Sequence, residues 1–252
     1  MGGFGFHRET DVIDLNTNSD MMKSTFGKIP SRRIYAVGGL FGSNPIICGG
    51  YSFGSYEDYH NNCITLKDSK WIQTHETTIK RSYSASVQLN KTTLWILGGT
   101  GWHSPKLKDY GALNSTEFIG IDSNVGHPGP NLPYLLSKPC AVKYSEDKIY
   151  VIGGSRYNNA GNIVDGFSNK NLIFNPMNGF THIEGPSMIS DRRMHTCGLM
   201  TKGNQSKIVV AGGENIQDPK GVLSSVEIFD PTTNKWSPGK EIHFLNRNQL
   251  KC

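Results

Sequence analysis

The sequence predicts an all-β protein in which four-stranded sheets are arranged around an axis as a β-propeller. A short apolar run followed by Gly-Gly recurs along the chain, with successive first glycines 47, 49, 55 and 59 residues apart. Glycine is abundant, at 29 of 252 residues, and segments with helical periodicity are missing. A four-stranded sheet with two apolar faces is unstable alone, so we expect such sheets to stack and bury both faces.

The glycine pairs mark the end of the second strand in each predicted unit. Each pair follows an apolar run such as IYVI, and a further pair, Gly2-Gly3, stands at the start of the chain. A glycine lets the backbone of a neighbouring strand approach closely where a side chain would clash. We therefore assign a structural role in the repeat to Gly49, Gly50, Gly98, Gly99, Gly153, Gly154, Gly212 and Gly213.

A small residue thirteen positions before the first glycine marks the first, innermost strand. It is Ala36, Ala85 or Cys140 in three of the units. Cys197 takes this place in the fourth unit if the insert 201–207 lengthens that hairpin by two residues. Small side chains suit a strand near the crowded axis of a propeller.

A third and a fourth strand complete each unit. The third is a second apolar segment that follows a polar, variable loop, and the fourth carries an aromatic residue that fills the wider outer gap between sheets. The aromatic residues are Trp71, Phe180 and Trp236. The apolar segments are 11–15, 63–66, 116–119, 172–174 and 226–229.

An aromatic residue 21 or 23 positions after a glycine pair, as from Gly50 to Trp71 and from Gly213 to Trp236, resembles the kelch repeat. The segment 225–236 matches it best, and the likeness covers essentially the whole chain. It implies a kelch-type β-propeller of four full blades and a partial one, in a single domain over residues 1–252. We expect the repeats at 1–30 (partial), 31–77, 78–133, 134–188 and 189–240, with 241–252 as a tail or closing strand.

We expect the ring to be incomplete rather than closed. Residues 241–252 could close a five-bladed ring, yet they are polar and are not followed by another apolar run with Gly-Gly. Gly2-Gly3 has no apolar strand before it. The chain is therefore expected to be a fragment, with coding sequence upstream of Met1.

Charge and cysteine usage leave the compartment open. The net charge of +5 comes from dispersed Lys and Arg, without the block typical of a nucleic-acid arm, and no apolar run is long enough to span a bilayer. The first ten residues lack the layout of a signal peptide, which slightly favours the cytoplasm over secretion. Three glycosylation sequons, at Asn90, Asn114 and Asn204, match the number expected by chance.

The sequence predicts no catalytic residue, metal site or cofactor. Residues 50–54 match G-x-S-x-G, but that motif needs a helix after the serine, so we interpret the match as coincidence. The five cysteines lack the spacing of a zinc site. Cys48 and Cys63 could pair across neighbouring strands, and we favour buried thiols for them.

Two sets of side chains are candidates for binding a protein partner on one face. An arginine lies four residues before the small inner-strand residue in three units, and aromatic residues gather in the loops after the glycine pairs. The alternatives are that the arginines bond carbonyl groups of the adjacent blade and that the aromatic residues only pack their own loops. The predicted partner-binding residues are Arg32, Arg81, Arg193, Tyr51, Phe53, Tyr56, Trp102, His103, Arg156 and Tyr157.

The resemblance implies a non-catalytic protein-interaction module whose blades position partner-selecting loops. It suggests actin or a ubiquitin-ligase substrate as the partner, without nucleic acid or a membrane span. Two alternatives stay open: a propeller enzyme of the copper-radical oxidase or sugar-processing type, and a secreted carbohydrate-binding protein.

Overall fold

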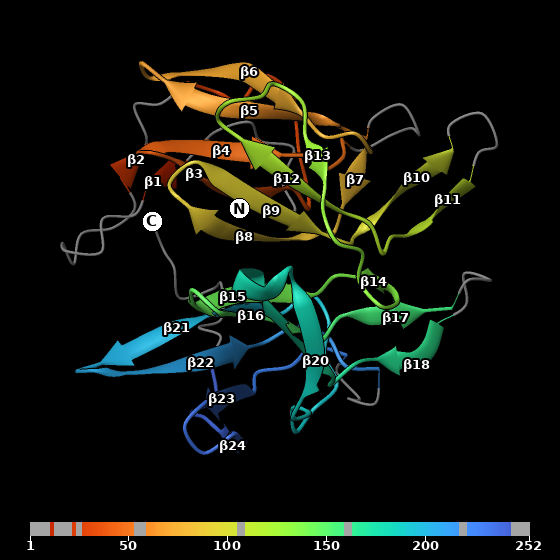
Figure 1. Ribbon diagram of the computed structural model, residues 1–252, viewed down its shortest axis with the longest axis vertical. Coiled ribbons are helices and arrows are strands. Elements are labelled where there is room, and N and C mark those ends of the chain that lie inside the picture. Colours follow the sequence, from red (N-terminus) through yellow and green to blue (C-terminus); the bar gives the residue numbers. More distant parts are fainter. Residues whose placement is uncertain are drawn as a thin grey trace, which may run out of the picture. The chain divides into compact units, whose positions relative to one another are not determined.

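The computed structural model describes residues 11–12, 22–23, 27–52, 59–104, 109–158, 163–216 and 221–242. Antiparallel strands dominate these residues, which confirms the predicted all-β class (Figure 1). The chain forms two compact units, Met1–Pro133 and Tyr134–Cys252. The expected single domain and its repeat boundaries stay a prediction. Within the described ranges, no helix is long and apolar enough to cross a membrane.

Unit 1 contains two four-stranded sheets in which the strands pair in chain order. The first sheet comprises β3 (Val37–Phe41), β4 (Asn44–Cys48), β5 (Asn62–Lys67) and β6 (Lys70–Glu76). The second comprises β8 (Ala85–Asn90), β9 (Thr93–Leu97), β12 (Thr116–Gly120) and β13 (His127–Pro128). A three-stranded sheet joins β7 (Arg81–Ser82), β10 (Thr100–Ser104) and β11 (Asp109–Ala112), and β1 (Asp11–Val12) pairs with β2 (Met22–Lys23).

Unit 2 repeats this arrangement. Its first four-stranded sheet comprises β15 (Cys140–Ser145), β16 (Lys148–Ile152), β19 (Asn171–Asn175) and β20 (Thr181–Gly185), with a 3-10 turn at Pro176–Asn178. Its second comprises β21 (Thr196–Lys202), β22 (Gln205–Ala211), β23 (Val226–Asp230) and β24 (Lys235–Pro238). The three-stranded sheet joins β14 (Leu135–Ser137), β17 (Ser155–Tyr157) and β18 (Ile163–Phe167).

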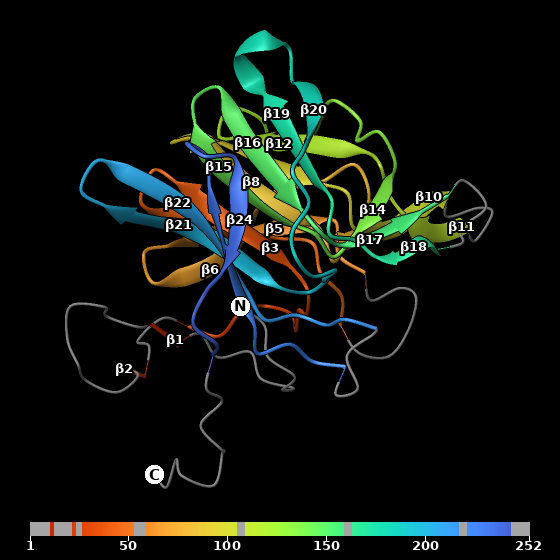
Figure 2. The same ribbon diagram turned by 90° about the horizontal axis from the view of Figure 1, so that it is seen from below.

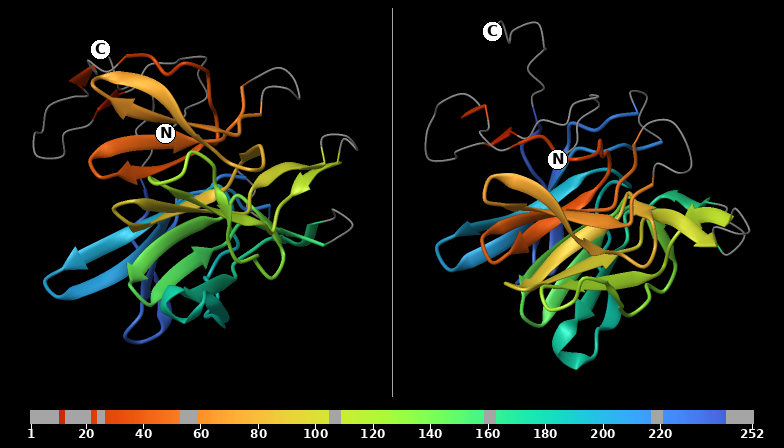
Figure 3. Two further views of the ribbon diagram at one scale, coloured as in Figure 1. Left: turned by 45° about the horizontal axis from the view of Figure 1, so that its top comes forward. Right: turned by 90° about the horizontal axis from the view of Figure 1, so that it is seen from above.

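The stretches after two of the glycine pairs form hairpins where loops were expected. In unit 1, β10 and β11 pair with each other, and β10 also pairs with β7. In unit 2, β17 pairs with β18 and with β14 in the same way. Each hairpin projects beyond the four-stranded sheets of its own unit (Figures 2 and 3). These stretches are long enough to fold back and satisfy their own backbone groups.

The glycine pairs have the predicted structural role and a second one. All eight have φ between +54° and +96°, a region that favours glycine. At Gly49 the first glycine faces the segment that leads into the next four-stranded sheet, because a Cβ would lie 2.5 Å from the carbonyl oxygen of Arg81 on β7. The second faces the segment that leads into its own four-stranded sheet, because a Cβ on Gly154 would lie 2.8 Å from the carbonyl oxygen of Ser137 on β14. The close backbone approach inferred from the sequence is therefore confirmed.

An apolar core lies between the two four-stranded sheets of each unit. In unit 1 it combines side chains of β3, β4 and β5 with side chains of β9 and β12. In unit 2 it combines β16 with β22 and β23. Stacked sheets thus bury their facing surfaces, as the sequence predicts. The unit 1 core contains Phe41, Ile46, Cys48, Cys63, Leu94, Ile96 and Ile119, and the unit 2 core contains Tyr150, Ile152, Met188, Ile208, Val210 and Phe229.

The first hairpin of each sheet explains an error of one position in the predicted repeat. All four hairpins have two-residue turns, but β8 and β15 contain a bulge and β3 and β21 do not. A bulge adds one residue to one strand. The residues opposite the last position of the second strand are Val37, Ala85, Cys140 and Thr196. Ala36 lies one residue before this position because β3 has no bulge. Cys197 lies one residue after it because the hairpin 196–211 is three residues longer than the bulged hairpin 85–97, where two were expected.

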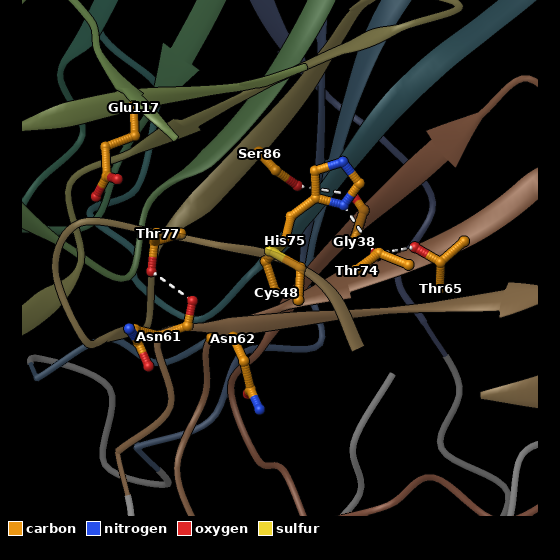
Figure 4. The surroundings of a disulfide bond; sticks show 12 residues. Gly38, Cys48, Asn61, Asn62, Thr65, Thr74, His75, Thr77, Ser86 and Glu117 are labelled. Atoms are coloured by element: carbon orange, nitrogen blue, oxygen red, sulfur yellow. Dashed lines mark hydrogen bonds between the residues drawn. A yellow bond between two sulfur atoms is a disulfide. The ribbon is translucent and has the colours of Figure 1, made fainter. Parts of the chain in front are cut away.

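Two disulfides correct the expectation of buried thiols. Cys48 and Cys63 are direct partners on β4 and β5, with Cα atoms 4.0 Å apart, and they form a disulfide. Figure 4 shows this bond near His75, which is opposite Cys63 on β6. A second disulfide links Cys140 to Cys197, and therefore the first strands of two neighbouring sheets.

Candidate functional site

Arg81, expected on the binding face, is 1% exposed. Its guanidinium donates to the carbonyl oxygens of Gly98 (3.0 Å) and Ser115 (3.1 Å) and forms an ion pair with the buried carboxylate of Glu117. Burial lowers the pKa of Arg81, and the carboxylate of Glu117 opposes that shift. Arg81 holds strand ends of its sheet together, so the prediction that it binds a partner is wrong.

Arg192, rather than Arg193, is the counterpart of Arg81 in unit 2. Its guanidinium donates to the carbonyl oxygen of Gly212 at 2.8 Å and to a carboxylate oxygen of Glu227 at 2.6 Å. The observed strand pairing explains the difference: Thr196 pairs with the last residue of β22 as Ala85 pairs with the last residue of β9, and Arg192 lies four residues before Thr196 just as Arg81 lies four before Ala85. By the same count, Arg33 rather than Arg32 is the counterpart in the first sheet. Burial lowers the pKa of Arg33 to about 10.

Each glutamate that pairs with a buried arginine also accepts a backbone N–H from the segment before that arginine. Glu117 accepts the N–H of Thr78, and Glu227 accepts that of Ile189 at 2.7 Å. Each donor lies three residues before the arginine. In the other two sheets this position is a proline, which has no N–H, and the glutamate position holds an apolar residue. In the sheet that begins with β3, the proline is Pro30 and Ile64 stands at the glutamate position. In the sheet that begins with β15, the proline is Pro133, Leu172 stands at the glutamate position, and Leu136 stands at the arginine position.

Four tyrosines form a cluster in unit 1. The rings of Tyr35 and Tyr83 are stacked with centroids 3.9 Å apart, and Tyr51 stacks on Tyr59 at 5.1 Å. Tyr51 also lies 6.0 Å from Tyr35, and its hydroxyl is 3.5 Å from that of Tyr83. Burial and the hydrogen bond with Tyr51 raise the pKa of Tyr83, so its hydroxyl stays protonated. All four side chains are half-buried, and we call them the tyrosine cluster.

The lead-in to each inner strand places a side chain in a conformation that only glycine adopts readily. Tyr35 and Tyr83 have φ of 54° and 55°, and the N–H of Tyr83 donates to the carbonyl oxygen of Tyr35. In unit 2, Lys138 and Met194 have φ of 60° and 56° and are linked in the same way. Backbone strain of this kind costs roughly 1–3 kcal/mol per residue and clusters at functional sites. Two of these four positions hold tyrosine and the other two hold lysine and methionine, so no single residue type marks the conformation, and sequence reasoning missed it.

Arginines stack on aromatic rings in unit 2. Arg193 lies 3.9 Å above the ring of Phe167 and pairs with Glu214 at 3.0 Å. Arg156 lies 4.0 Å above the ring of Tyr134. These contacts are typical of planar guanidinium groups, and they fix both side chains in half-buried positions. Burial, followed by the nearby Arg193, lowers the pKa of Lys138, while Glu214 opposes the shift.

Ser52 of the G-x-S-x-G match touches a histidine. Its hydroxyl donates to the carbonyl oxygen of Arg32 at 2.8 Å and lies 3.0 Å from Nε2 of His60. The same nitrogen is 3.2 Å from the Arg32 carbonyl oxygen. Because the carbonyl group competes for both donors, this contact closes the loop after Gly50 and does not by itself activate the serine.

The remaining predicted residues divide between described and undescribed positions. Arg32 is exposed, and Tyr157 is half-buried on β17. Trp102 and His103 lie on β10, and their side chains fall outside the described residues, as do Phe53 and Tyr56 entirely. Trp71 and Trp236 lie half-buried on the fourth strands β6 and β24, as expected for repeat residues; the indole of Trp236 donates to the carbonyl oxygen of Pro186 at 2.9 Å.

Within the described part of the chain, no group of three or more His, Cys, Asp or Glu residues could hold a metal ion.

Comparisons with known proteins agree with this architecture. The family described as Kelch motif matches residues 204–241, which contain β22, β23 and β24. Kelch-like protein 40a of Danio rerio is 34% identical over 97 residues, which are 38% of this chain and 15% of that protein. The solved structure of YjhT has a TM-score of 0.73 at 13% identity, over 96% of this chain and 85% of that one. At this identity the likeness to YjhT shows the fold alone.

Proposed function

Because the chain is a kelch-repeat protein with the fold of a β-propeller, we propose that it is a protein-interaction module that performs no chemistry of its own. It would bind a protein partner through the side chains around the lead-in segments and the stretches after the glycine pairs. The rigid sheets would position these segments, and the segments would select the partner.

The tyrosine cluster carries this proposal. Its rings come from the lead-ins to two inner strands and from the stretch after Gly50. Two of them, Tyr35 and Tyr83, are held at positive φ, a cost that a purely structural position can avoid by using glycine. Tyrosine supplies a large, rigid contact area with a polar tip, and it is enriched among residues that dominate binding energy. The arrangement therefore favours recognition of a partner surface.

Substitution of Tyr51 and Tyr59 tests the proposal. We expect Y51A/Y59A to lose partners recovered from an extract of the source organism, with an unchanged melting temperature. Met177→Ala serves as a control, because Met177 is a large side chain that is 75% exposed in the 3-10 turn between β19 and β20. If Y51A/Y59A keeps its partners, the cluster does not bind them. If Y51A/Y59A unfolds while Y51F/Y59F, which keeps the rings, folds and binds as the wild type does, the cluster serves packing.

An enzymatic function is the second candidate, and the Ser52–His60 contact is the observation that favours it. A hydrolase would lose turnover of ester or glycoside substrates on Ser52→Ala, whereas a binding module would keep its partners. Metal analysis of the purified protein distinguishes a copper oxidase from a binding module, because stoichiometric copper would contradict a module without catalytic activity.

A further inference from the structure

We propose that Asn90 and Asn204 carry N-linked oligosaccharides and that the chain acquires them in an oxidising compartment, where its two disulfides form. The proposal rests on three observations: the disulfides, the exposure of two sequons at equivalent hairpin ends, and the burial of the third sequon. It does not depend on the proposed binding face.

The disulfides identify the compartment. Four cysteines are paired in two bonds, Cys48–Cys63 within one sheet and Cys140–Cys197 between two sheets. Protein disulfides persist in secretory and extracellular environments and are rare where glutathione keeps thiols reduced. N-linked glycosylation takes place in the same oxidising pathway, so the sequons gain a meaning that their number alone did not give them.

Asn90 lies at the exposed end of β8, next to the two-residue turn that leads into β9. Its side-chain oxygen Oδ1 accepts the N–H of Thr92 at 2.8 Å and the hydroxyl of Thr92 at 3.0 Å. Both bonds use the amide oxygen and therefore leave the amide nitrogen, to which the sugar would be attached, unused by them. Asn90 and Thr92, the first and third residues of the sequon, are both exposed.

Asn204 occupies the equivalent turn in unit 2. It follows Gly203 in the two-residue turn between β21 and β22, and the residues from 201 to 205 are all exposed. The hydroxyl of Ser206, the third residue of this sequon, lies 2.9 Å from that of Thr201 on the surface. A large polar oligosaccharide can extend from this turn without displacing any packed side chain.

Asn114 supplies a contrast inside the same chain. Its sequon ends at Thr116, which is 2% exposed. The Thr116 hydroxyl accepts from the indole of Trp95 at 2.9 Å and donates to the carbonyl oxygen of Pro130 at 2.8 Å. Asn114 itself is half-buried, and its carbonyl oxygen accepts the N–H of Leu132. We therefore expect Asn114 to remain unmodified in the folded protein.

The modification transfers a sugar from a lipid diphosphate donor. The side-chain Nδ2 of asparagine forms a bond to the anomeric carbon, the bond from that carbon to the donor phosphate breaks, and Nδ2 loses a proton as the lipid diphosphate leaves. At both sites the sugar would stand at the hairpin end of its sheet. The glycine pairs lie at the other end of the second strand, so the stretches that follow them would stay uncovered.

Peptide mapping of the protein isolated from its own organism tests the proposal. Thiols are alkylated without reductant, and glycans are removed with peptide-N-glycosidase F in ¹⁸O-water, which converts each glycosylated asparagine to labelled aspartate. We expect labelled residues at 90 and 204, unlabelled Asn114, and a peptide pair joined through Cys140 and Cys197. Unlabelled asparagine at both 90 and 204, or alkylated Cys140 and Cys197, would overturn the proposal.

A second arm uses the full chain expressed behind a secretory leader. Asn90→Gln and Asn204→Gln should each remove one glycan from the mass of the secreted protein, while Asn114→Gln leaves the mass pattern unchanged apart from the substitution itself. A glycan lost in Asn114→Gln would contradict the argument from burial. A wild-type chain secreted without any glycan would refute the assignment of both sites.

Discussion

Arg192→Leu removes the cation from a fully buried ion pair. Arg192 and Glu227 have side-chain exposures of 0% and 3%, and the guanidinium also satisfies the carbonyl oxygen of Gly212. Losing one partner of a buried pair leaves an uncompensated charge and typically costs about 3–5 kcal/mol. We therefore expect R192L to lower the free energy of unfolding by about 4 kcal/mol.

The sheet of β15, β16, β19 and β20 suggests how the loss can be reversed. At the positions that correspond to Arg192 and Glu227 it has Leu136 and Leu172, each 1% exposed. R192L/E227L copies this apolar pair, so the buried charge disappears. The N–H groups of Ile189 and Ser190 then lose their acceptor, at about 1 kcal/mol each for partly buried groups. We expect the double variant to regain about half of the loss.

A third substitution removes one of the orphaned donors. Ile189→Pro places a proline where Pro133 stands in the other sheet, and proline has no N–H. The triple variant R192L/E227L/I189P should therefore come within about 1 kcal/mol of the wild type, since one donor instead of two lacks an acceptor.

Chemical denaturation and thermal melting measure these differences. At about 2–4 °C per kcal/mol for a chain of this size, R192L should melt about 8–16 °C below the wild type. Arg193→Leu is the matched control, because the Arg193–Glu214 pair has side chains 22% and 36% exposed and is worth less than about 1 kcal/mol. The reasoning fails if R193L costs as much as R192L, or if the double variant is no more stable than the single one.

Three further predictions concern pH, the disulfides and the glycines. Burial, together with the nearby Arg192, lowers the pKa of His195 to about 3. As the pH falls, the unfolded state therefore takes up the proton first, near pH 6.5, which favours unfolding. The free energy of unfolding should be highest above pH 6.5 and fall by at most about 5 kcal/mol towards pH 3, as measured by urea titrations. H195L should flatten this dependence and the exposed-site control H182Q should not. Loss of the Cys140–Cys197 bond, which closes a loop with a sequence separation of 57, should lower the free energy of unfolding of C140S/C197S by up to about 4 kcal/mol. C48S/C63S opens a loop with a separation of 15 and should lose about 3 kcal/mol. Equal melting temperatures of the wild type and C140S/C197S would contradict this. Gly154→Ala should melt well below Gly179→Ala, because a Cβ would meet the Ser137 carbonyl oxygen at 2.8 Å in the first case and open space in the second; similar melting curves would disprove the close-approach argument.

The sequence predicted the features of the fold that depend on local pattern. The glycine pairs, the strands of each four-stranded sheet, and the tryptophans of the fourth strands β6 and β24 follow from residue type and spacing. Phe180, predicted on a fourth strand, lies just before β20. The bulges do not, because one extra residue in β8 or β15 leaves the apolar runs unchanged. That extra residue moved the assignment from Arg33 to Arg32. The shift from Arg192 to Arg193 has another cause: the hairpin 196–211 is three residues longer than the bulged hairpin 85–97, where two were expected.

The candidate site was less accessible to sequence reasoning. Arg81 and Glu117 are 36 residues apart, and only the stacking of strands shows that they meet. To predict the Cys140–Cys197 bond, one would need the register of two separate hairpins, which the sequence pattern does not give. The left-handed conformations of Tyr35 and Lys138 share no residue type, whereas the glycines with the same conformation were evident at once.

The Cys140–Cys197 bond also determines how this region would respond to mechanical force. The covalent loop that it closes spans 57 residues and contains the whole sheet of β15, β16, β19 and β20. A pull on the two ends of the chain passes through the sulfur atoms and bypasses that sheet. About 200 Å of extensible length is thereby withheld, at up to about 3.5 Å per residue. Stretching the oxidised protein in a force spectrometer should thus release less chain than its residue count implies, and a reductant should restore the missing length.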